Sequence, residues 1–171
     1  MKPEARSDNR SGIGAQLASF LSDRCDAITA QCVAAFERDA LIPISDNLTL
    51  LQLKDHLPSL FGNLSDTLRD AFDQNRKREA TETATKHGEH RWIEGYDLSE
   101  LIREFAHVRT VFIAHLLEFE ECHPDFGAAA KLFAQVTLHR FFDDAVRNSV
   151  EQFRAEQQLG GRQCSQQSPN P

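Results

Sequence analysis

The sequence predicts an all-α fold, a single-domain helical bundle of about five main helices, with globin-like packing as the alternative. Apolar residues recur at three- and four-residue steps along most of the chain, and no segment shows the alternation of a strand. Proline, glycine and capping signals separate the helical segments. With 171 residues, of which 40% are hydrophobic, the chain is long enough to bury one core.

The first predicted helix covers residues 13–39. Its apolar residues fall on one face, which is typical of an amphipathic helix. They are Ile13, Leu17, Phe20, Leu21, Ile28, Cys32 and Phe36. The segment LIPISDN, which contains Pro43, ends this helix.

A second helix is expected to begin at Thr49. Thr49 and Gln52 have the spacing of a capping box, in which each residue satisfies a free backbone N–H of the first turn. Pro58 lies within the pattern that follows, and because proline has no N–H it must kink the helix or begin a new one. The expected buried face beyond it consists of Leu60, Phe61, Leu64, Leu68 and Phe72.

Two further helices are expected to meet at Gly95. A charged connector, DQNRKREATET, precedes a short helix over residues 84–94, which Gly95 ends as a left-handed cap. Asp97 and Glu100 have the spacing of an N-cap and its third-position partner, and so predict a helix over 97–120. The last helix is expected over 128–158.

The two ends of the chain differ from this helical pattern. Residues 1–11 are polar, and residues 159–171 are rich in Gly, Gln and Pro. Neither segment has enough apolar side chains to offset the entropy lost on ordering. We therefore expect a disordered N-terminus (1–11), a helical domain (12–158) and a disordered polar tail (159–171).

The acidic composition narrows the classes of partner. A net charge of -7 argues against nucleic-acid binding, which needs a basic surface, and against docking on an anionic membrane. No apolar run is long enough to span a bilayer, and the opening MKPEARSDNR lacks the apolar core of a secretory signal. We expect a cytoplasmic protein with no nucleic-acid or membrane partner.

Titratable side chains concentrate in HGEHRWIEGYDLSELIREFAHVR, residues 87–109. On a helical wheel Arg109 falls within the apolar face of its helix, where an unpaired charge costs several kcal/mol. We expect Arg109 to be buried and paired with a carboxylate of a neighbouring helix; a role in ligand binding or signal relay is the alternative. The candidate partners are Asp55, Glu89 and Glu94.

The histidines raise the alternative of a metal or haem protein. His87 and His90 share a helical face, and residues 104–107 and 120–123 both read E-x-x-H. A di-iron bundle needs such pairs on two helices, whereas both pairs here fall on one helix. The C-x-x-C-H signature of attached haem and the motifs of nucleophilic or nucleotide chemistry are absent from the sequence. We predict no metal, no cofactor and no enzymatic activity.

The last predicted helix has apolar residues on two sides, so it either lies centrally or uses one side for a partner. One stripe contains Leu132, Phe133, Val136, Phe142, Val146, Val150 and Phe153. The second stripe contains Ala134, Leu138, Phe141 and Ala145. A contiguous apolar patch on a surface usually marks an interface. We predict a homodimer formed through the second stripe, with help from the first helix.

Two motifs, taken in order, resemble a known family. LKDHLPSLFGNLSDTL (53–68) and HGEHRWIEGYDLSELIREFAHVR (87–109) resemble the N-terminal sensory domain named after the RsbR and RsbRD co-antagonists of the stressosome, which also precedes many bacterial histidine kinases. The resemblance covers about residues 13 to 155. Its matching polar positions, expected to form a polar core, are Asp55, His56, His87, Arg91, Tyr96, Glu100, Glu104 and Arg109.

The resemblance implies a function in signal transduction. Domains of this family are all-helical, often dimeric input modules. By this comparison the chain is a non-enzymatic sensory domain that relays a signal through its C-terminal helix to a histidine kinase or a STAS-type partner. Two other classes stay open: a phosphotransfer bundle, in which an exposed helical histidine accepts phosphate, and a haem- or metal-binding helical protein.

Overall fold

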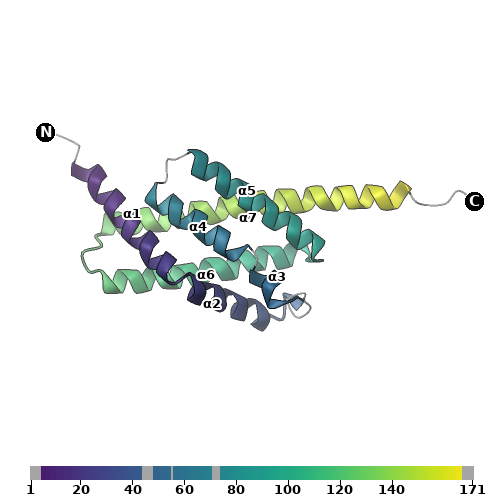
Figure 1. Cartoon of the computed structure of the whole chain (residues 1–171), viewed down its shortest axis with the longest axis horizontal. Coiled ribbons are helices and arrows are strands. Elements are labelled where there is room, and N and C mark those ends of the chain that lie inside the picture. The colour runs from purple at the N-terminus through teal and green to yellow at the C-terminus, as the bar shows by residue number, and fades with distance from the viewer. Residues whose placement is uncertain (1–4, 44–47, 55, 71–73, 167–171) are drawn as a thin grey trace, which may run out of the picture.

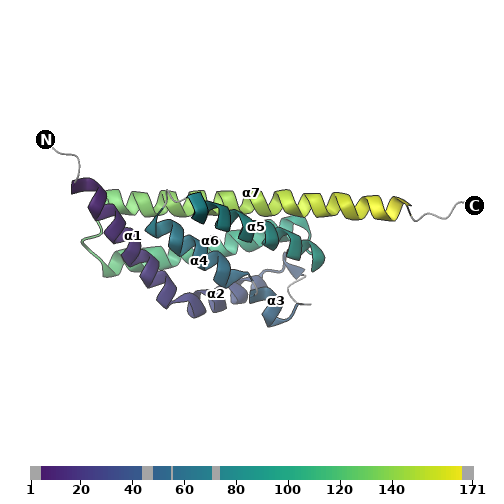
Figure 2. The same ribbon diagram turned by 45° about the horizontal axis from the view of Figure 1, so that its top comes forward.

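The structure is a computed structural model that describes residues 5–43, 48–54, 56–70 and 74–166. Every regular element within these ranges is a helix, so the predicted all-α fold is confirmed. The helices pack as a bundle, and the long helix α7 (Ala128–Gln166) runs along it and projects past the other helices (Figures 1 and 2). Across the described ranges, no helix has both the length and the apolar composition of a membrane span.

The predicted helix over 13–39 is two helices in the structure. Helix α1 (Ala5–Asp23) and helix α2 (Cys25–Arg38) meet at Arg24, whose φ of -108° and ψ of 9° interrupt the helical backbone. Helix α1 packs against α4, and α2 packs against α6. The apolar residues keep the same helical spacing on both sides of the break, although they pack against two different helices. Periodicity alone therefore could not reveal the break.

The segment after Thr49 is also divided. The Gln52 backbone N–H donates to Thr49 Oγ1 at 3.3 Å and the Thr49 N–H donates to Gln52 Oε1 at 2.9 Å, which confirms the capping box. Helix α3 (Leu50–Lys54) is short, and Pro58 lies in the first turn of α4 (Leu57–Arg69). Pro58 therefore begins a new helix, at a position where its missing N–H breaks no intrahelical bond. Of the expected buried face, Phe72 lies outside the described residues.

Helix α5 (Gln74–Ile93) is longer than the helix predicted over 84–94. From Gln74 onward the charged connector is helical, since it contains strong helix formers and neither proline nor glycine. Gly95 ends the helix with a φ of 88°, as predicted. Its N–H donates to the Trp92 carbonyl at 3.1 Å and the Tyr96 N–H donates to the Arg91 carbonyl at 3.0 Å, the two bonds of a Schellman motif.

Helix α6 (Leu98–Cys122) has the start that was predicted. The Asp97 carboxylate accepts from the N–H groups of Ser99 and Glu100 at 2.7 and 2.9 Å. The Glu100 carboxylate accepts from the Asp97 N–H at 2.7 Å, which completes the capping box. These hydrogen bonds lower the pKa of Asp97.

The helical segments extend beyond the predicted body of residues 12–158. Helix α1 begins at Ala5 and α7 continues to Gln166, so 5–11 and 159–166, expected to be disordered, are helical. Once a helix is nucleated, each added residue gains a backbone hydrogen bond without further tertiary contact.

Helices α5 and α7 approach each other closely at Gly88. A β-carbon at this position would lie 2.1 Å from the Ser149 carbonyl oxygen, so the contact requires glycine. The Ser149 hydroxyl donates to the Ala84 carbonyl of α5 at 2.6 Å. Farther along, the Trp92 ring packs edge-on against Phe153 with centroids 5.4 Å apart. Together these contacts fix α7 on α5.

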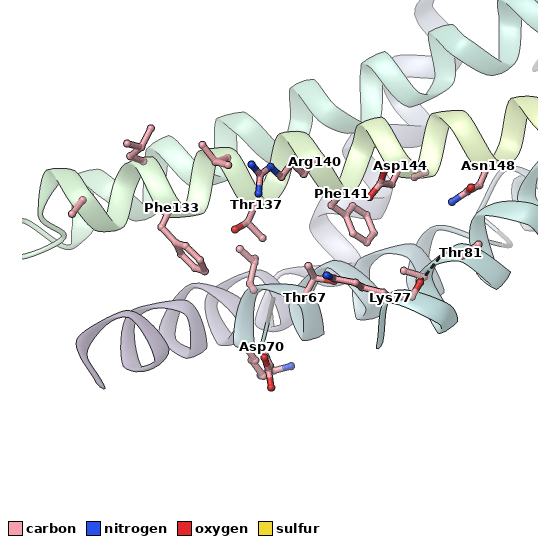
Figure 3. Close-up of a pocket in the computed structure, with 17 residues that line it drawn as sticks. Thr67, Asp70, Lys77, Thr81, Phe133, Thr137, Arg140, Phe141, Asp144 and Asn148 are labelled. Atoms are coloured by element: carbon pink, nitrogen blue, oxygen red, sulfur yellow. Dashed lines mark hydrogen bonds between the residues drawn. The ribbon is translucent and has the colours of Figure 1, made fainter. Parts of the chain in front are cut away.

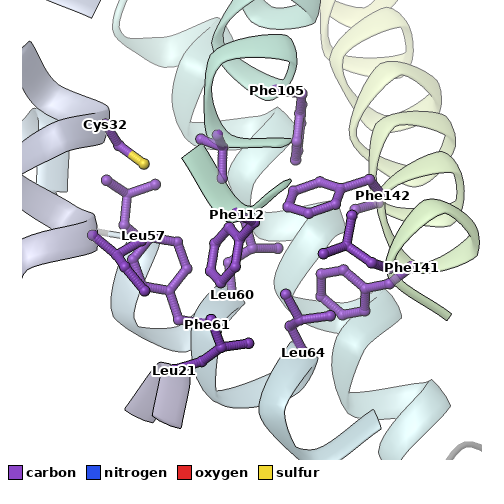
Figure 4. Close-up of a cluster of buried hydrophobic side chains, with 14 of the residues drawn as sticks. Leu21, Cys32, Leu57, Leu60, Phe61, Leu64, Phe105, Phe112, Phe141 and Phe142 are labelled. Carbon is purple, nitrogen blue, oxygen red and sulfur yellow. The ribbon is translucent and has the colours of Figure 1, made fainter. Parts of the chain in front are cut away.

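The predicted dimer interface is part of the core. Ala134, Leu138, Phe141 and Ala145 are only 3%, 1%, 7% and 3% exposed within a single chain. Figure 4 shows Phe141 and Phe142 of α7 among the buried side chains of the bundle. Because α7 packs against α6 as well as against α4 and α5, this stripe is buried within a single chain, and the prediction of an interface at this stripe was wrong.

Candidate functional site

Arg91 of α5 is completely buried, yet its guanidinium is surrounded by acceptors. Its Nε and Nη2 donate to the two carboxylate oxygens of Glu104 at 2.8 and 2.6 Å. Its Nη1 donates to Glu94 Oε2 at 2.5 Å and to the Gln52 carbonyl at 3.1 Å, and Nη2 also donates to the Leu53 carbonyl at 3.4 Å. These bonds compensate the loss of water around a buried charge.

Glu104 and Arg91 hold each other in their charged forms. Burial by itself would raise the pKa of Glu104, but the Arg91 charge, helped by His87, outweighs burial and lowers the pKa from 4.5 to about 2. Burial would likewise lower the pKa of Arg91, and the Glu104 carboxylate raises it above its ordinary value instead. The pair is therefore ionic at neutral pH.

Tyr96 covers one side of the guanidinium. Its ring centroid lies 4.9 Å from the Arg91 Cζ atom, a distance typical of a cation–π contact. Burial, and then the charge of Glu104, raise the pKa of the Tyr96 hydroxyl. This hydroxyl has no hydrogen-bond partner within the described part of the chain.

His87 lies beside Glu104, and His56 and His90 continue the group of polar side chains from it. His87 is buried, and its Nε2 is 3.6 Å from Glu104 Oε2, which is too long for a hydrogen bond. The His87 ring packs edge-on against Phe105 and against His56, with centroids 4.9 and 5.5 Å apart. His56 Nε2 and His90 Nδ1 are 2.9 Å apart and share a hydrogen bond.

A small cavity opens between His56, His87 and Glu104, closed by apolar side chains of α4 and α6. Its volume is about 10 Å³. That is close to the least space in which a buried water molecule fits.

The structure brings most of the predicted polar core together. Five of these residues form one cluster, in which His56 is half-buried and the others are buried: His56, His87, Arg91, Tyr96 and Glu104. Glu100 is buried nearby, where it caps the start of α6. Asp55 lies outside the described residues.

Arg109 is not part of this cluster, and its expected burial was wrong. Its side chain is 29% exposed, and Nη2 donates to Asp143 Oδ1 of α7 at 2.9 Å. Asp143 was not among the expected partners and is itself 68% exposed. Glu94, expected for Arg109, binds Arg91 instead. Apolar periodicity could not indicate the burial of Arg91, because α5 is polar around most of its circumference and no apolar sector marks its buried face.

The E-x-x-H pairs do not converge on a common point. Glu104 binds Arg91, whereas His107 Nε2 lies 2.7 Å from Asp39 Oδ2. This hydrogen bond lowers the pKa of Asp39, and nothing in the local sequence indicated it, because the two residues are 68 positions apart. In the described ranges, no three or more His, Cys, Asp or Glu side chains are grouped so that they could hold a metal ion.

No family model, no curated protein and no solved structure matches this chain.

Proposed function

We propose that this protein is a non-enzymatic sensory or regulatory input domain that relays a conformational signal through α7 to a histidine kinase or STAS-type partner. The observation that carries the proposal is that one helix, α5, contributes His87 and Arg91 to the buried cluster and also packs closely on α7 at Gly88. The resemblance of residues 53–68 and 87–109 to the stressosome and kinase input domains supports the same class.

The route of the relay follows from four residues of α5. His87 and Arg91 face the cluster. Gly88 and Trp92 face α7, against Ser149 and Phe153. A change at the cluster that displaces α5 therefore also displaces the surface on which α7 rests. Such a change transmits a signal when the stimulus binds one of two arrangements better than the other.

The distal part of α7 is the region proposed to contact the partner. It projects beyond the other helices (Figure 2). It also carries an exposed apolar side chain, Leu159, which is 53% exposed.

The phosphotransfer and haem alternatives receive less support at this site. His87 is 5% exposed and faces Glu104, whereas a phosphoacceptor histidine must be exposed. The cavity beside His56 and His87 has a volume of only about 10 Å³, so a haem does not fit there.

Affinity purification from the native host tests the proposal. We expect a histidine kinase or STAS-domain protein to be enriched with the wild-type chain and lost with Leu159→Arg. Ile102→Arg, at a 45% exposed position of α6, is the matched control and should retain the partner. Glu104→Gln, in the cluster, should change the amount of partner recovered. Absence of any such signalling protein, or equal recovery with all variants, contradicts the proposal.

A further inference from the structure

A second site is formed by a groove between α7, the end of α4 and the first half of α5 (Figure 3). Its volume is about 860 Å³. Small-molecule sites generally occupy roughly 300–1,000 Å³ and are mostly apolar with a few polar groups. The groove shares no lining residue with the buried cluster.

The walls of the groove are largely apolar. The large apolar side chains that line it are Leu68, Leu132, Phe133, Val136 and Phe141. Leu132 and Val136 remain 61% and 37% exposed, although they share a stripe of α7 with the buried Phe142 and Phe153. An apolar ligand in the groove would remove this surface from water.

Two cations line the groove from opposite helices. Lys77 comes from α5 and Arg140 from α7, and in the described part of the chain neither forms an ion pair with a carboxylate. Arg69 also lines the groove but is bound to Asp66 at 3.1 Å. Lys77 and Arg140 thus have their charges available for an anion.

The acidic residues of the lining limit the charge of that anion. Asp70 and Asp144 line the groove, and Asp144 is held by Arg147 at 2.9 Å. Three basic and two acidic side chains leave one positive charge in excess, on a chain whose net charge is -7. This balance suits a ligand with one negative charge better than a polyphosphate.

A hydroxyl group offers a further polar contact. Thr67 and Thr81 donate to carbonyls of their own helices at 2.7 and 2.9 Å. Thr137 of α7 points into the space between the helices, beside Phe141 (Figure 3). Its hydroxyl can bond a ligand oxygen there.

We propose that this groove binds a small amphipathic monocarboxylate, with its apolar body against Phe133, Val136 and Phe141 and its carboxylate paired with Lys77 and Arg140. The proposal goes beyond the signalling role and does not depend on it, since ligand binding can be measured without any partner protein.

Isothermal titration of the purified full chain tests this site. The probes are decanoate and 2-naphthoate as carboxylates, and decanol as a neutral analogue, all below micelle-forming concentrations. We expect at least one carboxylate to bind with one-to-one stoichiometry, and decanol to bind roughly tenfold more weakly than decanoate, because it lacks the charge-assisted hydrogen bonds.

Variants locate the binding. Lys77→Gln and Arg140→Gln should each weaken carboxylate binding roughly tenfold and leave decanol binding unchanged. Both positions are exposed, so the fold should be retained. Lys86→Gln and Arg154→Gln are matched controls on the same two helices, outside the groove, and should bind like the wild type.

Three results would overturn the proposal. The first is that neither carboxylate binds, and the second is that decanoate and decanol bind equally. The third is that light scattering shows a dimer for the wild type and a monomer for Val136→Glu. A second copy of the chain would then occupy the groove.

Discussion

Glu104 and Arg91 face each other across the turn between α5 and α6, joined by two parallel hydrogen bonds of 2.6 and 2.8 Å. The turn itself is closed by the left-handed Gly95 and by the Asp97–Glu100 capping box. The ion pair therefore locks a helix junction whose backbone is already specified locally. Loss of this ion pair should lower the free energy of unfolding while leaving the helix content unchanged.

Arg91→Ala should lower the free energy of unfolding by about 3–5 kcal/mol, because it leaves the Glu104 charge buried without its main partner. Arg109→Ala is the control. It removes a pair whose acid is 68% exposed and should cost no more than about 1 kcal/mol. Urea unfolding followed by circular dichroism measures both. Equal losses for the two variants would contradict the assignment of the buried pair to Arg91.

The stability of the protein should depend on the ionisation of Glu104 in acid. Its pKa is lowered in the folded state, from 4.5 to about 2, so its contribution is fully present above pH 4.5 and is lost as the pH falls towards 2. The contribution is on the order of 3 kcal/mol. Unfolding free energies of wild type and Glu104→Gln, measured across this range, should converge as the pH falls. A constant difference between them speaks against the lowered pKa.

Gly88→Ala should weaken the packing of α5 on α7. The added carbon would lie 2.1 Å from the Ser149 carbonyl oxygen, so the helices must separate, at a cost of about 1–3 kcal/mol or more. Gly62→Ala is the matched control within α4. A β-carbon there meets nothing within 4 Å, and the better helix propensity of alanine should stabilise the protein by up to about 1 kcal/mol. Thermal unfolding that moves in the same direction for both variants would contradict the close contact.

Phe141→Glu should unfold or strongly destabilise the chain rather than only alter its association. Phe141 is 7% exposed, and a carboxylate placed there loses its hydration without gaining a compensating hydrogen bond or ion pair. Leu132→Glu, at a 61% exposed position of the same helix, should leave helicity and melting temperature nearly unchanged. Circular dichroism and light scattering on the same samples separate folding from association. If the wild type is a dimer and Phe141→Glu is a well-folded monomer, this prediction is contradicted and the stripe is a dimer interface after all.

The helix boundaries that could be predicted are those specified by capping motifs of a few adjacent residues. Thr49 with Gln52, Gly95, and Asp97 with Glu100 each specify local hydrogen bonds, and the structure has all of them. The break at Arg24 could not be predicted in this way, since it depends on α1 and α2 packing against different helices.

The candidate site was predicted as a set of residues but not as a set of contacts. The motif pointed to His87, Arg91 and Glu104, whereas their pairing depends on how α5 and α6 fold back at Gly95. Arg109 was misplaced because a helical wheel gives the direction of a side chain but not the distance to the neighbouring helix. Its sector meets α7 at Asp143, near the surface.

The length of α7 beyond its contact with α5 has a mechanical consequence. A β-carbon at Gly160 would lie 3.4 Å from the Trp92 ring, so α7 is still beside α5 at this position. From Gly160 to Gln166 the helix extends about 9 Å, at roughly 1.5 Å per residue. It acts as a short lever whose fulcrum is the contact with Trp92. A tilt of about 5° at the fulcrum displaces the far end by about 1 Å, at the lower end of the helix shifts of roughly 1–2 Å that accompany switching at protein interfaces. A rearrangement at the cluster too small to disturb the core is thereby amplified at the end of the arm.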